Sequence, residues 1–179
     1  MILGLDISTS IVGYTIVDED GEIHSIGHVD LRKEKNFFRK ARLMEETLIA
    51  IDKEAPTWIQ EIYIEQSLQS FRSGFSSAQT LSLLSRFNGV VSWMCYNIFA
   101  LEPKYLAATS ARKLCGIRVP KGKKAKAVVM QFIIDNVPTF DVQYTRHGNP
   151  KPGYGDRADS YVIAKAGWVS ERQEAQNTD

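Results

Sequence analysis

The N-terminal segment constrains the possible folds of this chain more than any other part of it. Residues 2–21 read ILGLDISTSIVGYTIVDEDG, in which two apolar runs are joined by a short turn rich in Ser and Thr. The second run ends at Asp20-Gly21, a dipeptide typical of tight hairpin turns, and a third apolar run follows. We therefore expect an antiparallel meander of three strands, at about 2–8, 11–18 and 22–29.

Asp6 is the only charged residue of the first expected strand. An aspartate in this position, followed by a polar turn, begins two different superfamilies. In the actin-like and sugar-kinase ATPases the turn holds a nucleotide phosphate, and in the RNase H-like nucleases the aspartate binds a metal ion. Both superfamilies share one α/β fold, so the choice between the two functions depends on the rest of the chain.

The rest of the chain alternates between helical and extended patterns. Apolar residues at helical spacing predict an amphipathic helix within 32–54, and the alternating segment 58–66 predicts a fourth strand that ends at Glu65. The remaining expected elements are a long apolar helix at 76–99, a short strand at 104–108, and helices at about 109–115, 122–135 and 156–170. This order predicts an α/β, RNase H-like fold with a five-stranded mixed sheet, in which the three-strand antiparallel meander is followed by parallel strands and helices flank the sheet.

The composition fits one globular domain. The chain has 179 residues, of which 44% are hydrophobic, so it can bury a sizeable core. We assign residues 1–170 to a single RNase H-like domain and residues 171–179 to a polar, disordered tail. No uncharged apolar stretch is long enough to cross a membrane, and the N-terminal residues lack the pattern of a secretion signal, so we expect a cytoplasmic protein with no membrane partner. Cys95 and Cys115 lack metal-ligand spacing and are expected to be buried free thiols.

Charge is distributed unevenly along the chain. Residues 1–65 carry thirteen acidic and seven basic side chains, whereas residues 66–159 carry thirteen basic and five acidic ones. The fifteen residues 112–126 contain no acid and seven cations: Arg112, Lys113, Arg118, Lys121, Lys123, Lys124 and Lys126. Gly and Pro residues within this run indicate a bent loop between helices, which can follow a phosphate backbone, although a solvated helix face and a nuclear-type address are the ordinary meanings of such a run. We predict that this segment binds DNA.

Four carboxylates lie at element ends that this fold would bring together. Asp6 and Glu65 each stand at the end of a strand, and Asp156 and Asp159 share one face at the start of the last helix. If the first and fourth strands are neighbours, Asp6 and Glu65 emerge side by side at the edge of the sheet. Each residue alone has an ordinary alternative: a turn hydrogen bond for Asp6, an arginine partner for Glu65 and a helix cap for Asp156.

A cluster of four carboxylates requires cations. Two carboxylates about 4 Å apart repel by roughly 4 kcal/mol at an effective dielectric constant near 20. Oxygen-only ligands suit Mg²⁺ or Mn²⁺, and the lack of a Cys/His set argues against zinc. Two such ions about 4 Å apart could activate water and stabilise the departing oxygen of a phosphodiester. His147, in a polar loop, is expected to be a surface side chain rather than a catalytic base.

Four motifs in order resemble the RuvC family of Holliday-junction resolvases. They are GLDIS-x-x-x-x-GY at 4–14, IEQ at 64–66, TSARKLCGIRVPKGKKAKAVV at 109–129 and GDRADSYVIAKAG at 155–167. The resemblance implies that Asp6, Glu65, Asp156 and Asp159 are catalytic metal ligands. It places Lys113 (or Arg112) and Lys126 near the scissile phosphate, with Lys126 catalytic. It also implies a homodimer, built on the helix at 76–99, that cuts a four-way junction by paired symmetric nicks with Mg²⁺ in DNA recombination or repair.

The sequence departs from the family pattern in the loop after Glu65. The family commonly has an aromatic residue three positions after this glutamate, which wedges into the junction, whereas this chain has Leu68. Phe71 and Phe75, with Arg72 between them, are the candidates for that contact, and packing beneath the loop is the alternative. The loop before Asp156 is also expanded, which could alter substrate choice.

Three other functions are possible for a chain with this fold. An actin-like ATPase needs a second phosphate loop, and GDRADS at 155–160 does not provide one. Another RNase H-like nuclease, with broader specificity for branched or flap DNA or for RNA, would use the same metal chemistry. A non-catalytic DNA-binding module would not need all four carboxylates. We therefore expect a Mg²⁺-dependent junction endonuclease with a branched-DNA substrate and no small-molecule substrate.

Overall fold

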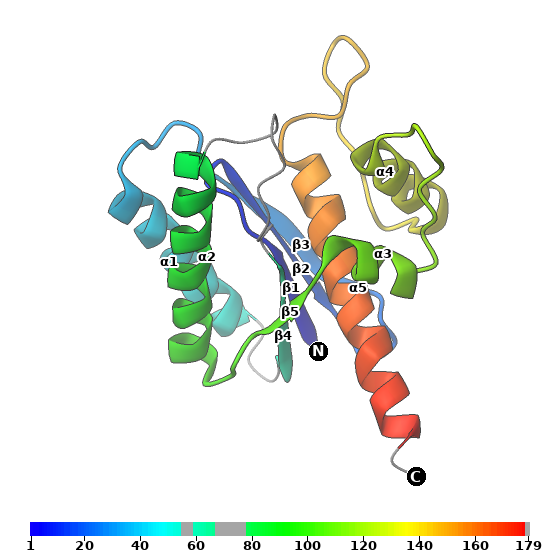
Figure 1. Ribbon diagram of the computed structural model, residues 1–179, viewed down its shortest axis with the longest axis horizontal. Helices are drawn as coiled ribbons and strands as arrows, with labels where there is room; N and C mark the ends of the chain where they lie inside the picture. Colours follow the sequence, from blue (N-terminus) through cyan, green and yellow to red (C-terminus); the bar gives the residue numbers. More distant parts are fainter. Residues whose placement is uncertain (55–58, 67–77, 178–179) are drawn as a thin grey trace.

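The protein is built around one five-stranded sheet. Figure 1 shows a computed structural model, which describes residues 1–54, 59–66 and 78–177. The strands lie in the order β3-β2-β1-β4-β5. Their bounds are β1 (Ile2–Asp6), β2 (Ile11–Val17), β3 (Ile23–Asp30), β4 (Glu61–Glu65) and β5 (Lys104–Leu106). The first three strands are antiparallel, whereas β4 is parallel to β1 and β5 to β4, which confirms the predicted mixed sheet.

Helices cover both faces of the sheet. On one face α1 (Phe37–Glu54) and α2 (Ala78–Phe99) lie side by side, and on the other α5 (Tyr154–Gln176) crosses the strands beside α3 (Ala108–Leu114) and α4 (Ala125–Asn136) (Figure 1). Side chains alternate along the strands, so Leu3 and Leu5 enter the core beneath α1 and α2, while Ile2 enters the core beneath α5. Among the described residues, no helix is both long and apolar enough to cross a bilayer.

Two strand glycines allow α5 to lie directly on the sheet. A Cβ atom on Gly4 would lie 2.4 Å from the backbone nitrogen of Ala164 in α5. A Cβ atom on Gly13 would lie 2.0 Å from the carbonyl oxygen of Asp156, at the start of the same helix. Because both obstacles are backbone atoms, no side-chain movement could make room. These glycines therefore fix where the N-terminal half of α5 meets the sheet.

The last helix is longer than the sequence pattern indicated. It continues to Gln176, six residues past the expected end at Ser170, so residues 171–176 of the expected polar tail are helical. The reason is contact with the sheet side of the molecule: Arg172 donates a hydrogen bond to the carbonyl of Glu19, and Glu171 accepts one from Lys104. Cys95 is buried as expected, whereas Cys115 is only partly buried, and both are free thiols.

Candidate active site

Asp6 and Glu65 lie side by side at one edge of the sheet. Leu5 pairs with Ile64 in the parallel register of β1 and β4, so the next residue of each strand reaches the same edge. From the sequence, we expected Asp6 and Glu65 to be adjacent only if the first and fourth strands were neighbours. In the structure β1 and β4 are neighbours. Both side chains are partly buried where their strands end.

Helix α5 brings Asp156 and Asp159 to the same edge. Asp6 pairs with Gly13 in the antiparallel register of β1 and β2, and Gly13 is the residue that touches the backbone of Asp156. The missing Cβ of Gly13 thus lets the start of the helix approach the strand end that carries Asp6. One turn further along α5, Asp159 is held at the same edge of the sheet.

A buried pair of hydroxyl groups fixes the register of α5 on β2. The Oγ1 of Thr15 and the Oγ of Ser160 are 2.8 Å apart, and neither residue is exposed to solvent. Ser160 gives its only hydroxyl proton to the carbonyl of Arg157, so Thr15 is the donor of the bond between them. Ser160 follows Asp159 directly, and the pair therefore limits how far that carboxylate can move. Nothing in the sequence indicates this pair, because Thr15 has the residue type of an ordinary strand position.

The electrostatic environment of the carboxylates is unfavourable to their charges. Burial, followed by the charges of Glu65, Asp159 and Asp156, raises the pKa of Asp6 well above its ordinary value. Burial and the charge of Asp159 raise the pKa of Glu65 to about 7. Burial likewise raises the pKa of Asp159, although Lys126 opposes the shift. Partly buried carboxylates that raise one another's pKa values are a feature that functional sites often show.

Lys126 extends from the start of α4 to the carboxylates. Its Nζ lies 3.5 Å from Oδ2 of Asp159. Burial alone would lower the pKa of this ammonium group, but the charges of Asp159, Asp6 and Asp156 raise it. The lysine side chain remains 75% exposed, so its ammonium group can contact a ligand and the carboxylate together.

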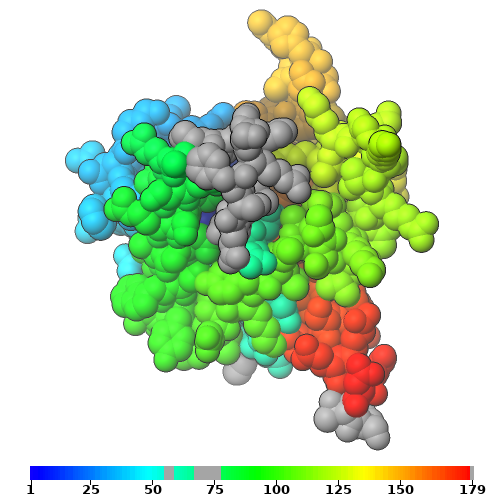
Figure 2. All heavy atoms as spheres, in the orientation of Figure 1, coloured from blue at the N-terminus to red at the C-terminus, as the bar shows by residue number. Residues whose placement is uncertain are grey.

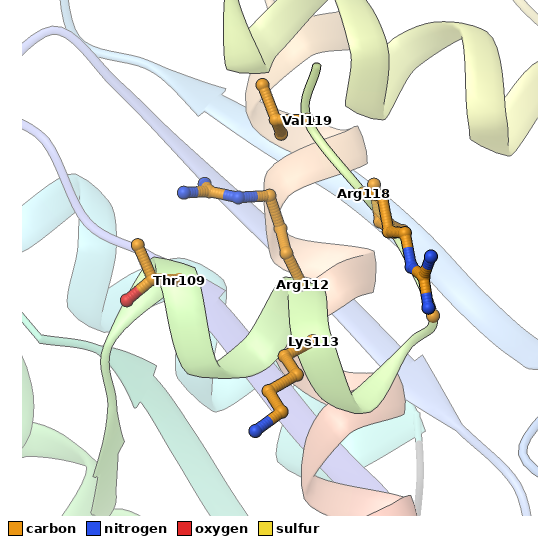
Figure 3. A pocket seen from close by; sticks show the side chains of 7 residues that line it. Thr109, Arg112, Lys113, Arg118 and Val119 are labelled. Atoms are coloured by element: carbon orange, nitrogen blue, oxygen red, sulfur yellow. The ribbon is translucent and has the colours of Figure 1, made fainter. Parts of the chain in front are cut away.

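Arg112, rather than its neighbour Lys113, acts on the carboxylates. The charge of Arg112 lowers the pKa of Glu65 and of Asp159, each against the larger effect of burial. Figure 3 shows that the two side chains leave α3 in different directions. The sequence left the choice between these residues open, and the geometry favours Arg112 as the cation beside the carboxylates.

A cavity of about 510 Å³ lies between α3 and the loop that follows it. Its walls combine cations with small and apolar groups (Figure 3): Thr109, Arg112, Lys113, Gly116, Ile117, Arg118 and Val119. Gly116 and Gly122 adopt left-handed backbone angles, with φ of 72° and 82°, and bend the chain as the sequence indicated. The other predicted DNA contacts in this segment are exposed: Arg118, Lys121, Lys123 and Lys124.

The remaining predicted residues lie elsewhere. Phe71, Arg72 and Phe75 fall outside the described residues. His147 is exposed and accepts a hydrogen bond from Arg146, so it does not lie with the carboxylates.

Arg157 and His28 form a contact beside the site that sequence reasoning missed. The Nε of Arg157 donates a hydrogen bond of 2.8 Å to Nδ1 of His28, whose ring must be neutral to accept it. Burial and the charge of Arg157 lower the pKa of His28, which favours that neutral form. His28 pairs with Gly13 in the sheet register, so this contact helps to hold the first turn of α5 against β3.

The donor atoms suit a hard divalent cation, but they are not arranged around a single point. Asp6, Glu65, Asp156 and Asp159 offer only oxygen ligands. The pKa values of Asp6, Glu65 and Asp159 are raised by burial and by neighbouring carboxylates, a penalty that a bound cation would relieve. Within 1–54, 59–66 and 78–177, no three Asp, Glu, His or Cys side chains converge closely enough to hold an ion. The residues therefore fit Mg²⁺ or Mn²⁺ by their chemistry, and their side chains would have to rotate to share one ion.

No protein-family model and no curated protein matches the chain by sequence. Among solved structures, the chain is similar to Thermus thermophilus RuvC in complex with a Holliday junction substrate, with a TM-score of 0.69 and 10% identity over 96% of this chain and 94% of that one. It is also similar to another structure of Thermus thermophilus RuvC (TM-score 0.64, 13% identity, 97% and 96% covered). The yeast mitochondrial Holliday junction resolvase Ydc2 gives a TM-score of 0.60 at 16% identity, with 99% of this chain and 82% of that one covered. The predicted RNase H-like fold of the RuvC type is thus confirmed.

Proposed function

We propose that this protein is a divalent-metal-dependent endonuclease that resolves four-way DNA junctions by paired symmetric nicks. The observation that carries the proposal is the meeting of Asp6, Glu65, Asp156 and Asp159 at one sheet edge, beside Lys126 and Arg112. The RuvC-type fold adds support, because the similar solved structures are Holliday junction resolvases. A role in DNA recombination or repair follows from this substrate.

The four carboxylates would hold Mg²⁺ or Mn²⁺, with two ions per active site. When bound, the ions supply Lewis-acid stabilisation of the phosphate oxygens and favour ionisation of water at neutral pH. The protein's own cations complete the site. Lys126 can donate to a phosphate oxygen from its exposed position, and Arg112 offers up to five N–H donors to the same backbone. Because Thr15, Ser160 and Gly13 fix α5 on the sheet, the carboxylates are held while DNA binds.

The segment 112–126 would hold the DNA backbone next to the carboxylates. Five of its cations, Lys113, Arg118, Lys121, Lys123 and Lys124, are exposed, so they can neutralise phosphates at low desolvation cost. Arg118, Lys121, Lys123 and Lys124 continue the positive surface outward from Arg112 and Lys126. Phosphate contacts of this kind position a duplex without reading its sequence.

Paired symmetric nicks require two active sites, which a two-fold dimer would supply. The exposed face of α2 carries two large aromatic side chains, Trp93 at 59% exposure and Tyr96 at 58%. One turn before Trp93, Gly89 leaves open space in which a second helix could approach. We therefore propose that α2 forms the homodimer interface.

A nicking assay with Mg²⁺ tests the function directly. The substrates are a four-way junction, a flap, a linear duplex and an RNA/DNA hybrid, each labelled on every strand. The proposal predicts cuts in two opposite strands of the junction at symmetry-related positions, and no cleavage when EDTA replaces Mg²⁺. Equal cleavage of flap and junction would instead indicate a general branched-DNA nuclease, and hybrid cleavage an RNase H. Binding of the junction without any cleavage would indicate a DNA-binding module.

A further inference from the structure

The start of α1 carries a second concentration of positive charge. Residues 32–42 contain six cations and a single acid, Glu34. The cations are Arg32, Lys33, Lys35, Arg39, Lys40 and Arg42. The acidic balance of residues 1–65 as a whole conceals this segment, so the sequence alone did not single it out.

Local partners do not neutralise most of this charge. Asp30 forms an ion pair with Arg32, whose Nη2 lies 2.6 Å from its Oδ2. The carboxylate of Glu34 accepts hydrogen bonds of 2.7 Å from the backbone N–H groups of Lys35 and Asn36, just before α1 begins. No ion pair within the described part of the chain involves Lys33, Lys35, Arg39 or Arg42. These four side chains are exposed, so the surface is strongly positive.

This segment lies at the same edge of the sheet as the carboxylates. The N–H of Leu31 donates a hydrogen bond of 2.8 Å to the carbonyl of Ser10, and the Nζ of Lys40 donates to the carbonyl of Thr9. Both acceptors belong to the turn that directly follows β1 and Asp6. Figure 1 shows the start of α1 and the segment before α4 on opposite sides of the start of α5, and Figure 2 shows these two segments on opposite sides of the same face of the molecule. Positive surfaces therefore flank the carboxylates on two sides.

An exposed aromatic ring lies among these cations. Phe38 is 77% exposed, more than any other large hydrophobic side chain among the described residues. Its neighbour Phe37 packs inward, with its ring centroid 5.7 Å from that of Phe87. The rings of Phe38 and Phe37 form a T-shaped pair, with centroids 5.5 Å apart and planes at 88°, and most of the Phe38 side chain remains open to solvent. At helical spacing Arg42 lies one turn further along the same face.

A single exposed aromatic side chain is common on protein surfaces, but the surrounding charge indicates its partner. Proteins that bind single-stranded nucleic acid combine cations along the backbone with aromatic faces on which bases stack. We propose that Lys33, Lys35, Phe38, Arg39 and Arg42 form a second DNA-contact surface. Its cations bind the backbone of one junction arm, and the ring of Phe38 stacks on an unpaired base near the branch point. This inference rests on the proposed function.

Salt-dependent binding tests the cations of this surface. The triple variant Lys33→Ala/Arg39→Ala/Arg42→Ala is compared with Lys53→Ala, which removes an exposed cation at the other end of α1. Affinity for a labelled four-way junction is measured from 50 to 300 mM salt in Ca²⁺. We expect the triple variant to bind about tenfold or more weakly at 0.1 M salt, with a slope of log affinity against log salt that is smaller by about two to three. A slope equal to that of Lys53→Ala would overturn the inference.

A second comparison tests the ring. Phe38→Ala should weaken binding to the junction by about fivefold or more while leaving linear duplex unaffected, because bases unpair more easily at the branch point than within a continuous duplex. Phe38→Trp should restore binding. The control Ile49→Ala truncates another exposed apolar side chain of α1. Equal losses on junction and duplex, or none on either, would overturn the stacking role. If the wild-type protein neither binds nor cuts junctions, the proposed function itself is wrong. If the wild type cuts junctions normally and the variants bind as well as the wild type, only the second DNA-contact surface is wrong.

Discussion

The carboxylate cluster and the basic surfaces beside it hold their charges in opposite ways. The cluster gathers residues from β1, β4 and α5 that packing holds in place and partly buries. Burial and mutual repulsion raise the pKa values of Asp6, Glu65 and Asp159. The cations of 112–126 and 32–42 lie on exposed loops and helix starts, and few have fixed partners. Chemistry on a phosphodiester requires groups held in place despite repulsion, whereas affinity for a polyanion requires only net positive charge on a surface. Substitutions should therefore act on rate in the first region and, gradually, on affinity in the second.

The largest effect is expected from single carboxylate substitutions. Asp6→Asn or Glu65→Gln should lower the cleavage rate by at least about a thousandfold, because each removes a ligand charge that the proposed metal site requires. Junction affinity should remain within about twofold, since the basic surfaces are unchanged. Single-turnover cleavage and binding in Ca²⁺ measure the two quantities. Asp52→Asn, which alters an exposed carboxylate of α1, is the matched control, and full activity of Asp6→Asn would contradict the assignment.

The pH dependence of cleavage should reflect the buried carboxylates. The pKa of Glu65 is raised to about 7, chiefly by burial, and the protonated form cannot serve as a charged ligand. The rate should therefore fall about tenfold per pH unit below the midpoint. Higher Mg²⁺ should move that midpoint to lower pH, because cation binding competes with protons. Single-turnover rates from pH 5.5 to 8.5 at two Mg²⁺ concentrations measure this, and a rate independent of pH would contradict it.

The same shifts predict that the carboxylate cluster lowers the stability of the metal-free protein. Because the pKa of Glu65 is higher in the folded than in the unfolded state, the folded protein binds more protons between about pH 4.5 and 7, and the free energy of unfolding falls as the pH rises through that range. Glu65→Gln should then stabilise the protein at pH 8 in EDTA by on the order of 1–3 kcal/mol. For a chain of this length the expected rise in Tm is roughly 2–4 °C per kcal/mol.

Thermal unfolding of the two proteins at pH 8 and pH 4.5 checks this prediction. At pH 4.5 the wild-type carboxyl is already protonated, so the difference in Tm should nearly vanish. Asp52→Asn should leave the Tm almost unchanged at both values, because that carboxylate is exposed. A Glu65→Gln variant that melts below the wild type at pH 8 would mean that the ionised carboxylate has a stabilising partner in the fold.

How far the sequence could anticipate this arrangement depends on the kind of contact. Asp6, Glu65, Asp156 and Asp159 could be placed at element ends because hydrophobic periodicity locates strands and helices, and the order of those elements indicates the sheet. The structure brings the four residues to one edge, as expected. The length of α5 could not be predicted, because its last turns depend on contacts of Glu171 and Arg172 with distant segments.

Contacts that join distant and ordinary residues left no trace in the sequence. Thr15 and Ser160 are separated by 145 positions, and His28 and Arg157 by 129. All four residues are of types that are common in a strand or helix, so none of them indicates a contact. The choice between Arg112 and Lys113 also depended on how α3 is rotated, and a seven-residue helix has too little periodicity to reveal its orientation. Packing between elements, rather than local pattern, decides such details.

The smallest effect is expected from the exposed lysines of the α3–α4 segment. Lys123→Ala/Lys124→Ala should weaken junction binding by several-fold at 0.1 M salt and reduce the slope of log affinity against log salt by up to about two, because each phosphate contact contributes about 0.9 to that slope. The cleavage rate of bound junction should change much less, since Lys126 and Arg112 are the cations whose charges act on the carboxylates. Lys53→Ala, remote from both basic surfaces, should leave the slope unchanged. If the double variant has the wild-type slope, these two lysines do not contact DNA. The salt dependence of junction affinity must then come from other cations.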